Sequence, residues 1–491
     1  MLPLIKIPKE KSISSSPPSH HVYANTPDPT PSSSSWSSYL PTAWLNSPVP
    51  PPPPSNPSQP TPASFRNPWP SWHKPTKPEI WASFAWGADD DPSISLALSH
   101  LPSFPPLDPS LKPQPNFDLA TPNNPGEQAA RLLGIQTPDF SLPKQVKAKA
   151  TWMGHASALV QLQLSLPGNP GRPFRCLFDP IFSARASPSQ YAGPVRSYAP
   201  PCAVEDLPDE LDAVMISHNH YDHMDQPSLV KIWQRYKKGG IRFFVGLGNG
   251  KTLKAMGIDD ETAIVEMDWW DGVKLGDQVK VWCVPAQHNS SRAGMTRDEA
   301  LWSGWVVERE GGIRVFFGGD TGYQFHRDPK WPPVRDEDEE KEEEEEYPAC
   351  PAFKEVRDRI GRPDLLLLPI SVGATFAYLK SFVPLPDSVS PFPRHSAGVM
   401  GANHMPPWDA VRVLREMTAG GEGGQGRKTV AMGIHWGTFV TDPSEVLKTL
   451  GQLEYACQRQ GVKFARGVEK GEGKGGETTF VVVNHGESIC L

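Results

Sequence analysis

One short run of metal-ligand residue types constrains this chain more than any other feature. The run from His218 to His223 reads His-Asn-His-Tyr-Asp-His and follows an apolar segment, Ala213–Ile216, that predicts a strand. His218 and His220 are two residues apart, so in an extended segment their rings point to the same side. The chain then turns, which lets Asp222 and His223 face the same space. Imidazole and carboxylate together suit zinc, and iron or manganese also fits this donor set.

Three further ligand types stand at the ends of other predicted strands. They are His288 after the strand that ends at Pro285, Asp320 after the strand that ends at Phe317, and His435 after the strand that ends at Ile434. A single histidine at a strand end is more often structural than a metal ligand. In combination with the first run, however, the three residues predict a site for two metal ions.

The seven side chains divide into two sets of ligands. The division that we predict is His218, His220 and His288 for one zinc ion, Asp222, His223 and His435 for the other, and Asp320 as a bridge between the two. Two adjacent metal ions lower the pKa of a shared water and neutralise charge that grows on a phosphoryl oxygen. A phosphodiester can therefore be hydrolysed at such a site without a side-chain nucleophile.

Short β-rich runs bounded by turns dominate the chain from about residue 147 onward. A long run of this kind covers Ala150–Gln163. Three stretches have helical periodicity instead: Ser228–Lys238, Asp409–Met417 and Ser444–Gln460. Many strands with a few interspersed helices predict an α/β fold in which two sheets pack together and the helices lie outside them.

The sequence predicts three parts. Residues 1–64 are so rich in proline and serine that we expect a disordered tail, because such a segment buries too little apolar surface to offset its ordering entropy. Residues 65–146 form an aromatic and proline-rich extension, whose rings either pack on the domain or form a surface for lipid or a partner. Residues 147–491 form the hydrolase domain, with an acidic insertion at 335–347 that predicts a solvated loop.

Composition argues against binding to nucleic acid and bears on the location of the protein. The net charge of -7 lacks the basic footprint that binding to nucleic acid requires. Six cysteines without a Cys-x-x-Cys pair, and no secretory apolar region, predict a reducing, intracellular location. The longest apolar run, Leu365–Leu379, is too short to span a bilayer, so membrane contact is expected to be peripheral. The serine-rich start leaves a mitochondrial address open, although no arginine precedes Arg66.

The order of these motifs resembles the metallo-β-lactamase superfamily, which implies an αββα sandwich with two metals at one edge of the sheets. A narrower set of segments is similar to the N-acylphosphatidylethanolamine-hydrolysing phospholipase D family. These segments are Asn67–Trp72, Trp152–Ser157, Asp179–Ser183, Arg185–Tyr191 with Pro194, Gly319–Tyr323 and His435–Phe439. The resemblance implies hydrolysis of N-acylphosphatidylethanolamine to phosphatidic acid and N-acylethanolamine, at a membrane surface and with a tendency to form homodimers.

The resemblance also implies roles for individual residues. Tyr191 and His404 match positions that contact substrate, although a packed ring and a helix-start histidine are the respective alternatives. His155 and Asp179 are expected to orient ligands or to stabilise turns. The expected catalytic residues are Asp222, Asp320 and His404. Two other functions remain open at this point: a hydrolase of the same fold that acts on a soluble phosphodiester or sugar-phosphate lactone, and a non-enzymatic member that binds lipid or a partner.

Overall fold

The protein is described from a computed structural model. The described residues are 3–8, 19–23, 62–87, 91–104, 117–119, 121, 123–164, 171–292, 297–327, 337–371, 393–419, 428–467 and 478–491. Most of the range predicted as a disordered tail, including the run Pro50–Pro54, lies outside these residues.

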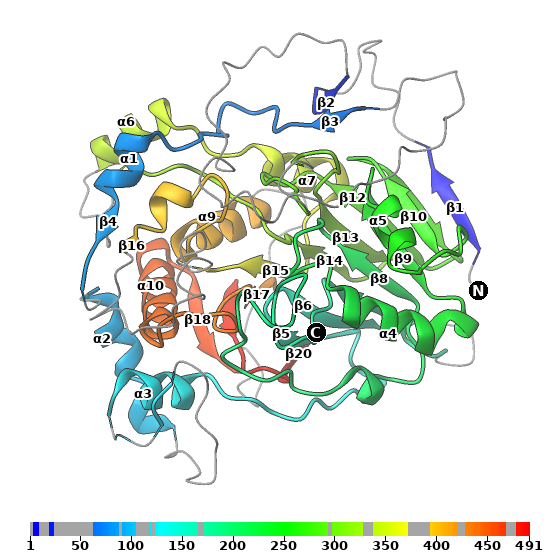
Figure 1. Cartoon of the computed structure of the whole chain (residues 1–491), viewed down its shortest axis with the longest axis horizontal. Coiled ribbons are helices and arrows are strands. Elements are labelled where there is room, and N and C mark those ends of the chain that lie inside the picture. The colour runs from blue at the N-terminus through cyan, green and yellow to red at the C-terminus, as the bar shows by residue number, and fades with distance from the viewer. Residues whose placement is uncertain are drawn as a thin grey trace.

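Two β-sheets form the centre of the molecule (Figure 1). Within the described residues the larger sheet has nine strands, in the order β1 (Leu4–Ile7), β11 (Gly272–Leu275), β12 (Val279–Val284), β13 (Gly304–Arg309), β14 (Arg314–Phe317), β15 (Leu365–Pro369), β17 (Val430–Ile434), β19 (Thr479–Val482) and β18 (Lys463–Arg466). The smaller has seven, in the order β10 (Ile264–Met267), β9 (Arg242–Gly246), β8 (Ala213–Ile216), β7 (Phe174–Phe178), β6 (Ser157–Leu162), β5 (Ala148–Gly154) and β20 (Ser488–Cys490). Two short pairs stand apart: β2 (His21–Val22) with β3 (Ser64–Phe65), and β4 (Phe84–Ala85) with β16 (Arg394–His395).

Helices cover the outer faces of the sheets (Figure 1). The α-helices are α1 (Lys77–Ala82), α2 (Ser93–Leu98), α3 (Pro125–Leu132), α4 (Gln226–Tyr236), α5 (Gly250–Ala255), α6 (Glu337–Glu346), α7 (Ala352–Ile360), α9 (Pro407–Thr418) and α10 (Ser444–Gln460). Short 3₁₀ helices occur at η3 (Leu101–Ser103), η4 (Val204–Asp206), η5 (Lys237–Gly239) and η6 (Gly398–Met400). Helices α7, α9 and α10 lie outside the larger sheet, and α4 lies outside the smaller one. The expected αββα sandwich is therefore confirmed.

The core is divided by the smaller sheet into an inner and an outer layer. Along β7, Cys176 and Phe178 face the core between the sheets, whereas Leu177 joins the outer cluster with helix α4. The ring of Phe178 stacks at a centroid distance of 4.5 Å on Phe317 from β14 of the larger sheet. A strand buried on both faces reads as a continuous apolar run, which is why Ala213–Ile216 stood out in the sequence.

Three predicted helices are confirmed, and one predicted strand is corrected. Helices α4, α9 and α10 overlap the three stretches that had helical periodicity. The run Ala150–Gln163 is two strands, because Gly154 and His155 adopt φ angles of 96° and 50° and turn the chain into the β5–β6 hairpin. Helix α3 was missed, although Asn124 caps it by accepting a hydrogen bond from the Glu127 N–H at 2.9 Å.

Two segments within the predicted disordered tail are ordered strands. Strand β1 pairs antiparallel with β11, with Leu4 opposite Leu275. The His21 end of β2 pairs with Phe65 in β3, and the adjacent His20 ring lies 2.8 Å from the Asp268 carboxylate. The expectation of disorder does not hold for these two segments, because each forms backbone bonds with a strand from elsewhere in the chain. Composition averaged over 64 residues does not reveal such short pairings.

The acidic insertion forms helix α6 and not the predicted loop. Its repeated glutamates are good helix formers. Basic partners on the domain offset their mutual repulsion: Glu343 lies 3.1 Å from the His326 ring, and Glu344 pairs with Arg412. The described part of the insertion is therefore held against the domain by charge pairs that are remote in sequence.

Some aromatic rings of the extension pack on the domain, and others are exposed. Trp69 packs on the domain and stacks on Trp269 at a centroid distance of 5.4 Å, and Phe65 is buried. Trp81 and Trp86, in contrast, are 74% and 61% exposed. Among the described residues, no helix has the length and apolar character needed to cross a bilayer.

Candidate metal centre

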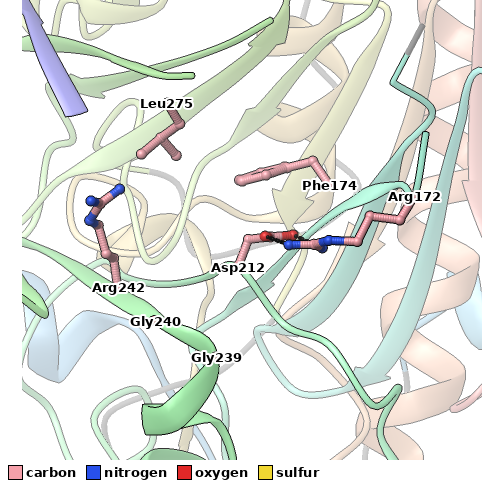
Figure 2. A pocket seen from close by; sticks show the side chains of 7 residues that line it. All are labelled: Arg172, Phe174, Asp212, Gly239, Gly240, Arg242 and Leu275. Atoms are coloured by element: carbon pink, nitrogen blue, oxygen red, sulfur yellow. Dashed lines mark hydrogen bonds and ion pairs between the residues drawn. The ribbon is translucent and has the colours of Figure 1, made fainter. Parts of the chain in front are cut away.

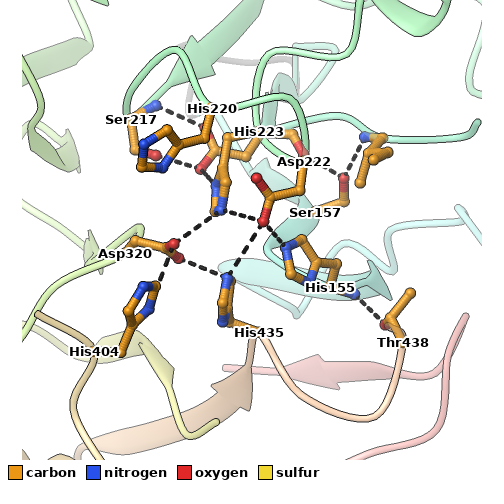
Figure 3. Close-up of polar contacts among 12 residues, drawn as sticks. His155, Ser157, Ser217, His220, Asp222, His223, Asp320, His404, His435 and Thr438 are labelled. Carbon is orange, nitrogen blue, oxygen red and sulfur yellow. Dashed lines mark hydrogen bonds and ion pairs between the residues drawn. The ribbon is translucent and has the colours of Figure 1, made fainter. Parts of the chain in front are cut away.

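The predicted ligands meet at one edge of the two sheets and form two adjacent clusters. Figure 3 shows part of this centre, with Asp320 beside His223 and His435, and Asp222 beside His155. Cluster A contains His218, His220, His288 and Asp320. Cluster B contains Asp222, His223 and His435, together with His155. In each cluster, one candidate ligand atom from every residue lies within 4.8 Å of the others. The structure therefore brings all seven predicted ligands together, with His155 as an additional member of cluster B.

Cluster A is built from three separate loops. In the turn after β8, Nε2 of His218 lies 2.7 Å from Nδ1 of His220. Nε2 of His288, in the loop after β12, lies 3.4 Å from the same His220 atom. The Asp320 carboxylate follows β14, and its Oδ2 lies 3.7 Å from Nε2 of His288.

Cluster B lies on the other side of Asp320. Oδ2 of Asp222 is 3.4 Å from Nε2 of His223 and 3.9 Å from Nε2 of His435. The two oxygens of Asp320 reach the same histidines, since Oδ1 is 2.8 Å from Nε2 of His435 and Oδ2 is 3.2 Å from Nε2 of His223. Asp320 thus contacts both clusters, which is the position that a bridging ligand requires.

Unusual backbone conformations are concentrated in this centre. His155, Asp179 and His435 have φ angles of 50°, 36° and 60°, in the left-handed region that side chains with a Cβ disfavour. Each follows directly after the buried end of a strand, so the strained residue turns its side chain into the centre. Strain of about 1–3 kcal/mol for such a residue persists only where the surrounding structure enforces it, and it collects at functional sites.

A buried carboxylate supports both clusters from behind. Asp179 accepts a hydrogen bond from Nδ1 of His223 at 2.7 Å and another from the Ser217 hydroxyl at 2.5 Å. The Ser217 oxygen in turn lies 2.9 Å from Nδ1 of His218. Asp179 therefore orients one ring in each cluster, as the expected role in orienting ligands requires. His155 lies closer to the centre than expected, with Nε2 2.8 Å from Asp222.

One supporting residue was missed by reasoning from the sequence. The Asn67 side chain donates to the His288 carbonyl at 2.6 Å and accepts from the His288 N–H at 3.2 Å. Next to it, the Ser71 hydroxyl donates to the Gln287 side chain at 2.5 Å. The segment Asn67–Trp72 had been noted only as part of a resemblance, and residue spacing gives no sign that Asn67 contacts the loop after β12, 221 residues away.

The clusters shift one another's pKa values. Burial and the neighbouring histidines hold the pKa of His218 and His288 well below the usual value. Burial raises the pKa of Asp320, but His223 and His435 outweigh it and keep the carboxylate ionised. Neutral imidazoles and ionised carboxylates are the forms that bind metals.

Several ligand atoms are buried without a hydrogen-bond partner. Among the described residues these include Nε2 of His223, Oδ1 of Asp320, Nδ1 of His404 and Nε2 of His435. Unsatisfied polar atoms are rare in protein interiors because each costs about 1–3 kcal/mol. A pair of metal ions held by these imidazoles and carboxylates would satisfy them, so the residues present fit a dinuclear metal site.

The two predicted substrate contacts occupy different environments. Nδ1 of His404 lies 3.6 Å from Oδ2 of Asp320, and its side chain is 16% exposed. Burial lowers the pKa of His404 to about 4. Tyr191 is 96% exposed, so its ring packs against nothing in the described chain. The structure therefore brings His404 to the centre and leaves Tyr191 on the surface.

Comparisons with known proteins give the family. The Beta-lactamase superfamily domain model matches residues 175–330. The N-acyl-phosphatidylethanolamine-hydrolyzing phospholipase D 1 of Caenorhabditis elegans is 31% identical over 69% of this chain and 74% of its own length. An uncharacterized protein of Mycobacterium tuberculosis is 30% identical over 68% of this chain and 71% of its own. The mitochondrial N-acyl-phosphatidylethanolamine-hydrolyzing phospholipase D of Saccharomyces cerevisiae is 24% identical over 59% of this chain and 49% of its own.

Solved structures are more distant. An isothiocyanate hydrolase from Delia radicum gut bacteria matches 70% of this chain and 98% of its own, at 15% identity and a TM-score of 0.41, which is too remote to bear on function. The conclusion rests on the sequence relatives: the chain belongs to the N-acylphosphatidylethanolamine-hydrolysing phospholipase D family of metallo-β-lactamase-fold, metal-dependent hydrolases.

Proposed function

We propose that this protein is a zinc-dependent phospholipase D that hydrolyses N-acylphosphatidylethanolamine to N-acylethanolamine and phosphatidic acid. The observation that carries the proposal is the position of Asp320 between clusters A and B, within 3.2 Å of two histidines of cluster B and 3.7 Å of His288 in cluster A. The 31% identity to the Caenorhabditis elegans phospholipase D supports the choice of substrate.

The residues of the centre have different proposed roles. His218, His220 and His288 would hold one ion, Asp222, His223 and His435 the other, and Asp320 both. When bound, two zinc ions lower the pKa of a water and neutralise charge on phosphoryl oxygens. Asp179 keeps the rings of His218 and His223 in position, which preserves the geometry that the reaction needs.

Two side chains of the centre keep partial solvent exposure, and we propose that the substrate approaches from their side. The Asp222 side chain is 29% exposed and that of His404 is 16% exposed, whereas those of His218, His223 and His288 are fully buried. Asp222 orients the attacking water by accepting its hydrogen bond. His404 donates a hydrogen bond to the leaving ethanolamide oxygen. His404→Ala should lower kcat, and unchanged activity across the pH range would show that this role is wrong.

We infer that the protein meets its substrate as a peripheral membrane protein. Trp81, Trp86 and Tyr191 are large aromatic side chains with most of their surface exposed, and such rings favour the membrane–water interface. The proposal predicts that vesicle binding falls in a Trp81→Ala, Trp86→Ala double variant. The control is a double variant of two exposed residues, Lys251→Ala, Lys254→Ala. A buried tryptophan such as Trp233 in α4 is not a matched control, because it lies in the core.

A mitochondrial membrane is the location that we propose, on the support of the yeast relative's name. Fractionation of cells that express the full chain, followed by carbonate extraction, tests both parts of the proposal. Recovery in the mitochondrial fraction and release by carbonate are expected.

The direct test uses metal-analysed protein and N-acylphosphatidylethanolamine in mixed micelles. We expect N-acylethanolamine and phosphatidic acid to form with the native chain and not with Asp320→Asn. Two bound ions without lipid cleavage would favour a soluble phosphodiester or sugar-phosphate lactone as the substrate. Lipid cleavage that survives in Asp320→Asn would show that the metal centre is assigned wrongly.

A further inference from the structure

A pocket lies at the opposite end of strand β7 from the metal centre. Its cavity is about 150 Å³. Phe174 lines it at the start of β7, whereas Asp179 follows the end of the same five-residue strand. The two sites are therefore about 17 Å apart along the strand. The lining residues, drawn in Figure 2, are Arg172, Phe174, Asp212, Gly239, Gly240, Arg242 and Leu275.

One of the two arginines in this pocket has its charge balanced. Nη1 and Nη2 of Arg172 donate to the two oxygens of Asp212 at 2.9 and 2.5 Å. Asp212 also accepts a hydrogen bond from the Arg175 backbone N–H at 2.9 Å. These bonds involve both carboxylate oxygens of Asp212, so the negative charge of Asp212 is paired with Arg172 (Figure 2).

The other arginine is buried without a partner. Arg242 is 7% exposed, and among the described residues its guanidinium makes no hydrogen bond or ion pair. Figure 2 shows its side chain extending beside Leu275 into the pocket. Burial lowers the pKa of Arg242, yet an arginine stays charged in proteins. No carboxylate among the described residues neutralises this guanidinium, which lines the pocket, so an anion that enters the pocket can pair with it.

We propose that this pocket is an oxyanion-binding site in which Arg242 pairs with a carboxylate or phosphate group. The planar guanidinium matches both groups through two parallel hydrogen bonds. Phe174 and Leu275 supply apolar wall for the remainder of the ligand. A cavity of about 150 Å³ has room for such a group, because one water occupies about 30 Å³ of liquid.

The test is calorimetric titration of the metal-loaded full chain with inorganic phosphate, and separately with acetate, at constant ionic strength. The variants are Arg242→Met, which keeps side-chain length, and Lys237→Met, which removes the same charge outside the pocket lining. Phosphate also has access to the metal centre. The two proteins are therefore compared for a phosphate-binding event that is present in the wild type and weakened in Arg242→Met. We expect this binding to be weakened at least about tenfold in Arg242→Met and retained in Lys237→Met.

Each outcome decides the proposal. Equal anion binding by wild type and Arg242→Met overturns it, as does equal weakening in Lys237→Met. A response to phosphate alone identifies a phosphate group as the ligand chemistry, and a response to acetate as well includes carboxylates. If Arg242→Met does not fold, Arg242→Lys decides, because it keeps the charge and loses the paired hydrogen bonds; unchanged affinity in that variant overturns the proposal. None of these readouts depends on lipid hydrolysis.

Discussion

The carboxylate of Asp179 lies 2.7 Å from Nδ1 of His223, and both side chains are fully buried. The same carboxylate reaches His218 through the Ser217 hydroxyl. One residue behind the metal centre therefore orients a ring in cluster A and a ring in cluster B. Burial raises the pKa of Asp179, and the bonds from His223 and Ser217 oppose that rise.

Asp179→Asn should weaken both metal sites together. The amide keeps the shape of the side chain but loses the charge that fixes the His223 tautomer, and such changes weaken metal affinity about 10–100-fold. Competition with a chelator measures the affinity for each ion. Asp364→Asn is the matched control. Asp364 is also buried, but it stands just before β15 and accepts a hydrogen bond from the Arg314 N–H instead of contacting the metal centre. Loss of only one ion would contradict the shared role.

Asn67→Ala should reduce metal affinity without any change to a ligand. The substitution removes both hydrogen bonds between Asn67 and the His288 backbone. We expect a loss of about 1–3 kcal/mol in stability, since two buried backbone groups lose their partner. Metal content and melting temperature are the measurements. Arg66→Ala is the neighbouring control, since the Arg66 guanidinium donates to the exposed Ser19 carbonyl and not to the His288 backbone. Equal effects of both variants would point to a general loosening of the extension.

Removal of metal should destabilise the whole domain. The two clusters join loops that follow β8, β12, β14 and β17, so bound ions tie both sheets together. At a free concentration a thousand times above Kd, each ion adds about 4 kcal/mol. Calorimetry before and after a chelator should show a lower melting temperature that zinc restores. A melting temperature that the chelator leaves unchanged would argue against a bound ion in the native protein.

The contact between His326 and its two acids should make stability depend on pH. Burial lowers the pKa of His326, but Asp409 and Glu343 outweigh it and raise the pKa to about 9, above the ordinary 6.5. Because the folded pKa is raised, the stabilisation is complete below pH 6.5 and is lost as the pH rises to about 9. The loss is roughly 2–4 kcal/mol.

Urea unfolding at pH 6.5, 7.5 and 9 measures this change. His326→Gln should be less stable than the native chain at pH 6.5 and should lose the difference at pH 9. A constant difference across the range would show that His326 does not titrate in this window. The prediction also concerns helix α6, because Glu343 is the residue through which the acidic insertion contacts His326.

The sequence by itself determined the chemistry of the centre and the type of fold. His218, His220, Asp222 and His223 are local in sequence, and a short segment with a two-residue period fixes where their rings can point. Helices α4, α9 and α10 could also be predicted from the sequence. Each buries one apolar face, so its apolar residues recur with the period of a helix.

Only the tertiary structure decided the contacts between segments that are far apart in the chain. The pairing of β1 with β11, the bonds from Asn67 to His288 and the solitary buried Arg242 each depend on where distant elements meet. The docking of α6 through Glu343 belongs to the same group. The period of apolar residues and the residue types show which face of a single helix or strand is buried. The contacts named above depend instead on which elements the sheets bring together. Local propensity contains no information about that arrangement.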